Sequence, residues 1–270
     1  MRITRLGQGV DETGFLHPDA ILRTTEVLAG YAGELARHGV TRVRATATSA
    51  ARDAGNRDAF FDAAERALGV RPELLPADEE ARLSFRGATA GLPASDGPFL
   101  VVDIGGGSTE FVLGSALPEA LISVKMGCVR MTERHFRNDP PTPAEMDACI
   151  ADVRESLVAV KSTIDFRRAR LMIGLAGTVT TLASLQQGLK TYSPTKTHHA
   201  RLTRLQVEDL LEPLSTEDIE GRRALLAEPE RARVIVAGTL VLVTILRELD
   251  ISELMVSESD ILDGLAASLR

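Results

Sequence analysis

The 270-residue chain has no tryptophan, only two cysteines and 4% aromatic residues. Two cysteines, Cys128 and Cys149, are too few for a disulfide scaffold or a cysteine-rich zinc site. The scarcity of aromatic rings argues against a surface on which nucleic-acid bases stack. No apolar run reaches the roughly 18 residues of a membrane span, and the first residues form no apolar signal segment. We therefore expect a cytoplasmic protein with no membrane partner.

The charge balance is acidic, with 31 basic and 38 acidic residues and a net charge of −7. Because a general nucleic-acid-binding protein is usually basic, we expect no nucleic-acid partner. A local cationic cleft for a polyanionic substrate is still compatible with this balance. Only four of the basic residues are lysine, and the planar guanidinium of arginine suits phosphate, although an arginine-rich genome explains the same excess.

Strands alternate with helices along the chain, which predicts the α/β class. The first residues and 42–48, 73–75, 99–105, 110–114, 120–127, 171–175 and 254–256 are expected strands. The expected helices are 17–38, 49–52, 58–68, 78–89, 128–136, 142–164, 178–186, 203–213, 230–248 and 260–270, and residues 188–201 are an expected loop. The turn-forming segment 91–98 predicts a domain boundary. We expect a first lobe over 1–97, onto which the helix 260–270 packs, and a second lobe over 98–259.

The strongest motif runs from Asp103 to Glu110, in the sequence DIGGGSTE. An apolar strand brings Asp103 to its end, and Gly105, Gly106 and Gly107 let backbone N–H groups approach an anion. Ser108 adds a hydroxyl donor, and Glu110 supplies a second carboxylate. Carboxylates on either side of a phosphate-binding loop are typical of a Mg²⁺–phosphate site.

Two other phosphate-binding motifs do not fit this run. A Walker A loop requires Gly-Lys-Ser/Thr and a following helix, whereas this run has no lysine and leads into a strand. A dinucleotide-binding fingerprint also requires a helix after the glycines.

A second glycine turn, residues 174–180, connects a strand to a helix. Thr178 is an expected cap of that helix, and a helix N-terminus favours anions. Turns of this kind are common in α/β proteins, so the motif alone is weak.

The chain resembles the exopolyphosphatase and guanosine pentaphosphate phosphohydrolase family. The resemblance runs in order along nearly the whole chain. It rests on residues 5–7, 47–56, 79–83, 103–110, 126–130, 174–180 and 236–238. It implies a two-lobed, actin-like α/β fold (the ribonuclease H-like superfold of sugar kinases and heat-shock ATPases), with a mixed sheet and helices in each lobe.

The resemblance also implies roles for individual residues. Glu80 matches the catalytic base that deprotonates the attacking water, and Asp103 and Glu110 match the carboxylates of the Mg²⁺ site. The remaining matches are expected phosphate contacts: Ser49, Arg52, Gly105, Gly106, Gly107, Ser108, Gly177 and Thr178. Taken without the resemblance, Glu80 would be interpreted as part of the solvated face of the helix 78–89, together with Asp78, Glu79 and Arg82.

The sequence departs from the family pattern in two places. Family members normally begin with a β-hairpin that carries a phosphate-binding loop, and this chain starts at about the next strand. The resemblance therefore leads us to expect a first lobe that lacks this hairpin, through a misplaced start or a real truncation. In addition, Pro76, Ala77 and Asp78 replace the usual residues before the paired glutamates, which we expect to alter a turn.

The resemblance implies Mg²⁺-dependent hydrolysis of the terminal phosphate of inorganic polyphosphate, with guanosine pentaphosphate (pppGpp) as the other candidate substrate. One alternative is a catalytically impaired homologue that binds phosphate or polyphosphate as a sensor or partner-binding protein. The other is an ATP-dependent small-molecule kinase of the same superfold. A homodimer is left open.

Overall fold

The computed structural model describes residues 2–269, which divide into two compact units. The first unit comprises Met1–Ala77 with Leu265–Arg270, and the second comprises Asp78–Gly264. Within residues 2–269, no helix combines the length and the apolar character required to cross a bilayer.

The first unit is mainly helical and contains a small two-stranded sheet. Its elements are α1 (Val10–Thr13), α2 (Pro18–Arg37), β1 (Thr46–Ala47), α3 (Ser49–Asp53), α4 (Arg57–Leu68) and β2 (Glu73–Leu74). The strands β1 and β2 pair in parallel. Phe60 and Phe61 of α4 are buried, and Asn56 ties the segment before α2 to this core through hydrogen bonds in both directions with Leu16, at 2.8 and 2.9 Å.

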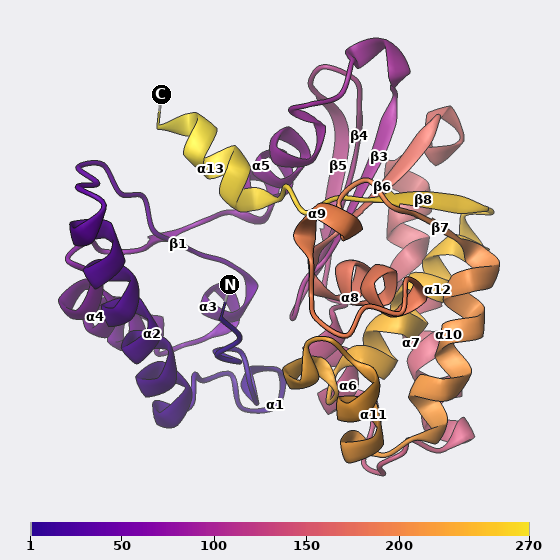
Figure 1. Cartoon of the computed structure of the whole chain (residues 1–270), viewed down its shortest axis with the longest axis horizontal. Coiled ribbons are helices and arrows are strands. Elements are labelled where there is room, and N and C mark those ends of the chain that lie inside the picture. The colour runs from indigo at the N-terminus through magenta and orange to yellow at the C-terminus, as the bar shows by residue number, and fades with distance from the viewer. Residues whose placement is uncertain (1, 270) are drawn as a thin grey trace. The chain divides into compact units, whose positions relative to one another are not determined.

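The second unit is built on a six-stranded mixed sheet with the order β5-β4-β3-β6-β8-β7 (Figure 1). Its strands are β3 (Phe99–Ile104), β4 (Thr109–Gly114), β5 (Pro118–Val124), β6 (Leu171–Leu175), β7 (Arg201–Thr203) and β8 (Glu253–Val256). The strands β3, β6 and β8 run parallel, and β4, β5 and β7 are antiparallel to their neighbours.

Helices and short 3₁₀ turns connect and cover these strands. They are α5 (Ala77–Thr89), η1 (Ala94–Asp96), α6 (Cys128–His135), α7 (Pro143–Thr163), η2 (Phe166–Arg168), α8 (Ala176–Gln186), α9 (Pro194–Thr197), α10 (Arg204–Thr216), α11 (Ile219–Leu225), η3 (Pro229–Arg231) and α12 (Ile235–Glu248). The last helix, α13 (Ile261–Ser268), begins in the second unit and belongs to the first unit from Leu265 onward. The helices α7, α8 and α12 supply the core of one sheet face, whereas α5 covers the opposite face.

The strand β3 explains the layered arrangement, because all six of its residues are buried. Leu100, Val102 and Ile104 point into the core shared with α7 and α12, and Phe99 and Val101 point to α5. A strand that is buried on both faces is expected to be a continuous apolar run. The predicted strand FLVVDIG and the α/β pattern of this unit agree with the structure.

The division into units differs from the predicted lobes of 1–97 and 98–259, because α5 packs on the sheet through Ala81 and Phe85. The structure also differs in several local elements. The expected strand over 42–48 is reduced to β1, and residues 2–5 form no strand. The expected loop over 188–201 contains α9 and the first residue of β7.

Candidate active site

Helix α5 directs two polar side chains toward the end of β3. Ala81, Phe85 and Ala88 belong to the apolar cluster under the sheet, which fixes the rotation of the helix. Glu80 and Ser84 are one turn apart, so they project from the same side of α5. Both are buried, Glu80 with 9% and Ser84 with 0% of its surface exposed. The structure therefore does not place Glu80 on a solvated face of the helix.

Asp103 and Glu110 lie opposite each other on the antiparallel strands β3 and β4. Directly opposed residues place their side chains on the same sheet face, with Cβ atoms about 4.5–5.5 Å apart. Ser84 Oγ donates a hydrogen bond to Asp103 Oδ2 at 2.7 Å, and Ser123 Oγ donates one to Glu110 Oε1 at 2.7 Å. The pair therefore lies on the face that α5 covers, with one oxygen of each carboxylate fixed by a serine.

These carboxyl groups are electrostatically coupled to each other and to Glu80. Burial is the main cause that raises the pKa of Asp103 above its ordinary value, opposed by the hydrogen bond from Ser84 and reinforced by the charge on Glu80. Burial also raises the pKa of Glu110, and the charges on Glu80 and Asp103 add to it. Asp103 and Glu110 are therefore two buried acids whose ionisation is disfavoured by burial and by neighbouring negative charge, and a positive charge nearby would favour their charged forms.

The glycine-rich loop after β3 is held by α6. The first amides of α6 donate hydrogen bonds to the carbonyl oxygens of Gly105 and Gly106 at 2.9–3.0 Å. Arg130 Nε donates to the carbonyl oxygen of Gly107 at 2.6 Å, and the side chain of Arg130 is buried. All three glycine carbonyls are therefore turned toward α6.

The loop keeps unused N–H donors as a result. The N–H of Gly105 donates to the carbonyl oxygen of Ser108 at 3.0 Å. In the part of the chain that the structure describes, the N–H groups of Gly106, Gly107 and Ser108 have no acceptor in the protein. Successive unpaired N–H groups in a glycine loop form an anion-binding concavity. The loop thus has the donors that a phosphate group requires.

Gly127 allows α6 to approach this loop closely, and the sequence assigned it no role. A Cβ atom at Gly127 would lie 2.5 Å from the carbonyl oxygen of Gly106 and 2.7 Å from that of Gly105. Only glycine fits such a close approach of backbone to backbone. The available signal was its position, a glycine between a strand and a helix that follows the phosphate-binding run.

The second glycine turn lies at the same edge of the sheet as the first. Asp103 and Leu175 are register partners on the parallel strands β3 and β6, so both turns follow the carboxyl ends of neighbouring strands. Ala176 has a left-handed backbone, with φ of 66°, a conformation that costs non-glycine residues about 1–3 kcal/mol and is typical of functional sites. Leu175 is the N-cap of α8, so the prediction that Thr178 caps this helix is wrong; Thr178 is buried inside its first turn.

Arg231 is a second residue that the sequence did not indicate. Its guanidinium occupies the space that a Cβ atom of Gly177 would need, so it lies directly against the second glycine turn. Its Nε donates to Glu228 Oε2 at 3.1 Å, and 12% of its side chain is exposed. Its charge also lowers the pKa of the Cys128 thiol, against the larger rise that burial causes. No periodic pattern distinguishes Arg231 from the neighbouring arginines.

The two remaining predicted contacts belong to the first unit. Ser49 is the first residue of α3 and is buried. Arg52 lies in the last turn of α3, where its Nη1 donates to the carbonyl oxygen of Leu75 at 3.0 Å. The structure therefore places Glu80, Asp103, Glu110 and both glycine turns in the second unit, and Ser49 and Arg52 in the first.

Comparison with known proteins identifies the family. The profile of the Ppx/GppA phosphatase family matches residues 1–269. The chain belongs to this family. It is 45% identical to exopolyphosphatase 2 of Mycobacterium tuberculosis over 278 residues, which cover 99% of this chain and 87% of that protein.

Longer relatives match as well. The chain is 32% identical to a guanosine-5'-triphosphate,3'-diphosphate pyrophosphatase of Aliivibrio fischeri, over 98% of this chain and 52% of that protein, so it spans about half the length of this relative.

Solved structures of related proteins match the fold of this chain along nearly its whole length. A crystal structure of an exopolyphosphatase-like protein has a TM-score of 0.95 and 38% identity, covering 99% of this chain and 89% of that one. The Aquifex aeolicus PPX-GPPA enzyme has a TM-score of 0.80 and 34% identity, covering 99% and 88%. The predicted family, the phosphohydrolase class and the two-lobed actin-like α/β fold class are confirmed. Ppx/GppA phosphatases are generally dependent on a divalent metal ion.

Proposed function

We propose that this chain removes the terminal phosphate of inorganic polyphosphate, and that it accepts pppGpp as a second substrate. The observation that carries the proposal is the glycine loop with three unused N–H donors beside the buried acids Glu80, Asp103 and Glu110. The names of the exopolyphosphatase and pyrophosphatase relatives support the two substrates.

The residues would divide the reaction between them. The terminal phosphoryl group would bind to the N–H groups of Gly106, Gly107 and Ser108, which oppose the negative charge that develops on its oxygens. Glu80 would accept the proton of a water molecule as that water attacks the terminal phosphorus. The bond from phosphorus to the bridging oxygen then breaks, and the bridging oxygen stays with the shortened chain. Positioning and charge stabilisation supply most of the catalysis in such transfers.

Asp103 and Glu110 fit a magnesium site that the substrate completes. In residues 2–269, no group of three or more His, Cys, Asp and Glu side chains is arranged to hold an ion, so the protein offers fewer carboxylates than a closed cage. Mg²⁺ is commonly bound by one or two carboxylates together with water and substrate phosphates. When bound, the ion supplies positive charge that offsets the acids and the phosphate oxygens.

Further phosphate groups of a chain substrate would bind nearby. Gly177 and Thr178 offer the N-terminus of α8, which favours anions, and Arg231 lies against that turn with a permanent positive charge. We also propose Ser49 and Arg52 as phosphate contacts, on the basis of the family resemblance alone.

The test is a phosphate-release assay with polyphosphate, pppGpp and ATP in parallel, with and without Mg²⁺. We expect Mg²⁺-dependent release from polyphosphate and from pppGpp. ADP formation that depends on an acceptor molecule would instead indicate the kinase alternative. Binding of polyphosphate in calorimetry without any release would indicate the sensor alternative.

A further inference from the structure

Arg222 is a buried arginine that joins three segments of the second unit. It lies in α11, and 3% of its side chain is exposed. Its Nε donates to the carbonyl oxygen of Ala232 at 2.8 Å, and its Nη1 donates to the carbonyl oxygens of Leu214, at 3.3 Å, and Glu217. A buried charge destabilises a fold unless it is paired and hydrogen-bonded, so these contacts and a counter-ion are needed.

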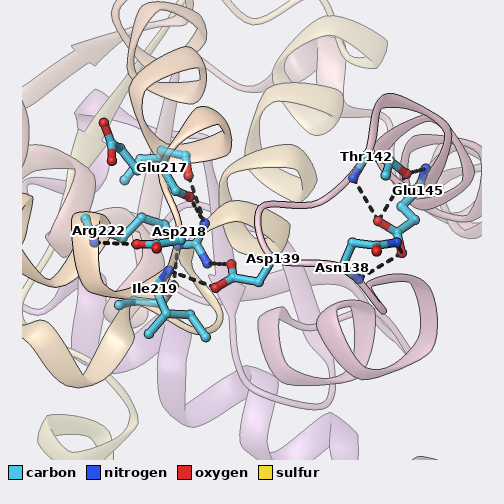
Figure 2. Close-up of polar contacts among 11 residues, drawn as sticks. Asn138, Asp139, Thr142, Glu145, Glu217, Asp218, Ile219 and Arg222 are labelled. Atoms are coloured by element: carbon cyan, nitrogen blue, oxygen red, sulfur yellow. Dashed lines mark hydrogen bonds and ion pairs between the residues drawn. The ribbon is translucent and has the colours of Figure 1, made fainter.

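Asp139 is that counter-ion, and it comes from the loop between α6 and α7 (Figure 2). One carboxylate oxygen accepts from Arg222 Nη2, and the other accepts from the N–H of Ile219 at 2.8 Å. Asp139 therefore fixes both the guanidinium and the start of α11.

Glu145, in the first turn of α7, holds the loop that carries Asp139. It accepts hydrogen bonds from the N–H groups of Arg137, Asn138 and Thr142 at 2.7, 3.1 and 2.8 Å (Figure 2). The loop that carries Asp139 is thus held by Glu145, in addition to the contacts that Asp139 itself makes with α11.

The third segment held by Arg222 leads to the candidate active site. Ala232, whose carbonyl oxygen accepts from Arg222, directly follows Arg231. Arg231 is the residue whose guanidinium lies against Gly177 at the second glycine turn. The main chain at Arg231 is further fixed by hydrogen bonds from its N–H to the carbonyl oxygen of Glu228 and from the N–H of Val234 to its own carbonyl oxygen. A shift of Ala232 therefore displaces the arginine at the turn.

We propose that the Asp139–Arg222 pair is a positioning unit that keeps Arg231 at the second glycine turn, where it binds phosphate groups of the substrate. The inference rests on the proposed function, because it takes a polyphosphate chain as the ligand of Arg231. Neither Asp139 nor Arg222 contacts the substrate. The pair acts on substrate binding, since the acids of the reaction centre lie on β3, β4 and α5.

The test is a double-mutant cycle on the full chain, with Asp139→Asn and Arg231→Gln alone and combined. Asp139→Asn keeps the shape of the side chain and removes its charge. We expect it to raise KM for polyphosphate about tenfold, the scale of a lost hydrogen bond to a charged group, with kcat changed less than about threefold. In the Arg231→Gln background the same substitution should leave KM unchanged, because coupled residues are not additive.

Glu119→Gln is the matched control. It removes a carboxylate from an exposed ion pair with Arg168 in the same unit, where the two groups are 2.6 Å apart. KM should be unchanged by it in both backgrounds. If Asp139→Asn fails to fold, Glu145→Gln is the second variant, since it loosens the same loop from an exposed position and should raise KM in the same Arg231-dependent way.

Two results would overturn the inference. One is that Asp139→Asn raises KM by the same factor in the wild-type and in the Arg231→Gln background. The other is that Asp139→Asn lowers the melting temperature while KM stays constant. Calorimetry gives the dissociation constant of polyphosphate for each of these variants, so the same double-mutant cycle can be evaluated without turnover. A wild-type chain that binds polyphosphate but releases no phosphate refutes the proposed function alone, whereas one that does not bind it refutes both.

Discussion

Replacing Gly127 by alanine tests whether the phosphate-binding loop depends on its contact with α6. The backbone of Gly127 is extended, with φ of −154° and ψ of 163°, so alanine adopts it without strain. The added methyl group would instead lie 2.5 Å from the carbonyl oxygen of Gly106, 2.6 Å from its carbonyl carbon and 2.7 Å from the carbonyl oxygen of Gly105. The obstacle is main chain, which cannot rotate away as a flexible side chain can.

The size of the effect follows from these distances. Carbon atoms in contact prefer separations of about 3.5–4.0 Å, so α6 and the loop would have to separate by roughly 1 Å. Overpacking of this kind costs about 1–3 kcal/mol of stability. A displacement of about 1 Å in a positioned group can lower a rate about 10²-fold, and loss of one donor to a developing oxyanion lowers it about 10²–10³-fold. We therefore expect kcat for phosphate release to fall about 10²-fold.

The measurement is steady-state phosphate release from polyphosphate, combined with thermal melting to show that the variant is folded. Gly91→Ala is the matched control in the same unit, because no atom lies within 4 Å of the added methyl group. It should keep the wild-type kcat. A folded Gly127→Ala variant with wild-type kcat would refute the reasoning that α6 sets the geometry of the loop.

Three further predictions concern the acids. Glu80→Gln should lower kcat about 10²–10⁴-fold, the usual contribution of a general base, with polyphosphate binding retained; wild-type turnover would rule out the assignment. Asp103→Ala or Glu110→Ala should raise the Mg²⁺ concentration needed for half-maximal activity or abolish activity, and an unchanged Mg²⁺ titration in both would make the pair structural. Backbone N–H donation lowers the pKa of Glu145 to about 2, so its contribution to stability is present above its ordinary pKa of 4.5 and is lost as the pH falls toward 2. Glu145→Gln should therefore reduce the loss of melting temperature between pH 4.5 and pH 2, and an identical pH dependence would contradict this.

The long elements could be predicted because their patterns are strong. The predicted helix 17–38 and the predicted strand 99–105 correspond to α2 and β3. Some short elements were also predicted, such as β2 and α3, but others could not be predicted from pattern. The strand β7 has three residues and forms only by pairing at the sheet edge with β8, and α11 contains a glycine and two arginines and buries little besides Arg222.

The candidate site could be predicted only where its residues are neighbours in the sequence. The run from Asp103 to Glu110 is local, so its strand, loop and strand were evident in the sequence. Arg231 and Gly127 act across the fold, one against Gly177 and the other against Gly106, and such contacts between distant segments leave no local pattern. The burial of Arg222 could not be predicted either, because nothing in the sequence indicates that Arg222 is buried and Arg223 is exposed.

The burial of the acids is itself an argument for a role in binding. Asp103 and Glu110 lie on strands whose other residues are all buried, and like charges at this position oppose each other's ionisation. Apolar residues of similar size would often serve stability as well or better than buried charges. The serines that donate hydrogen bonds to these acids are neutral, so they leave the net negative charge in place. A cation bound with phosphate would offset that charge, so the feature that weakens the isolated fold is the one that the proposed reaction requires.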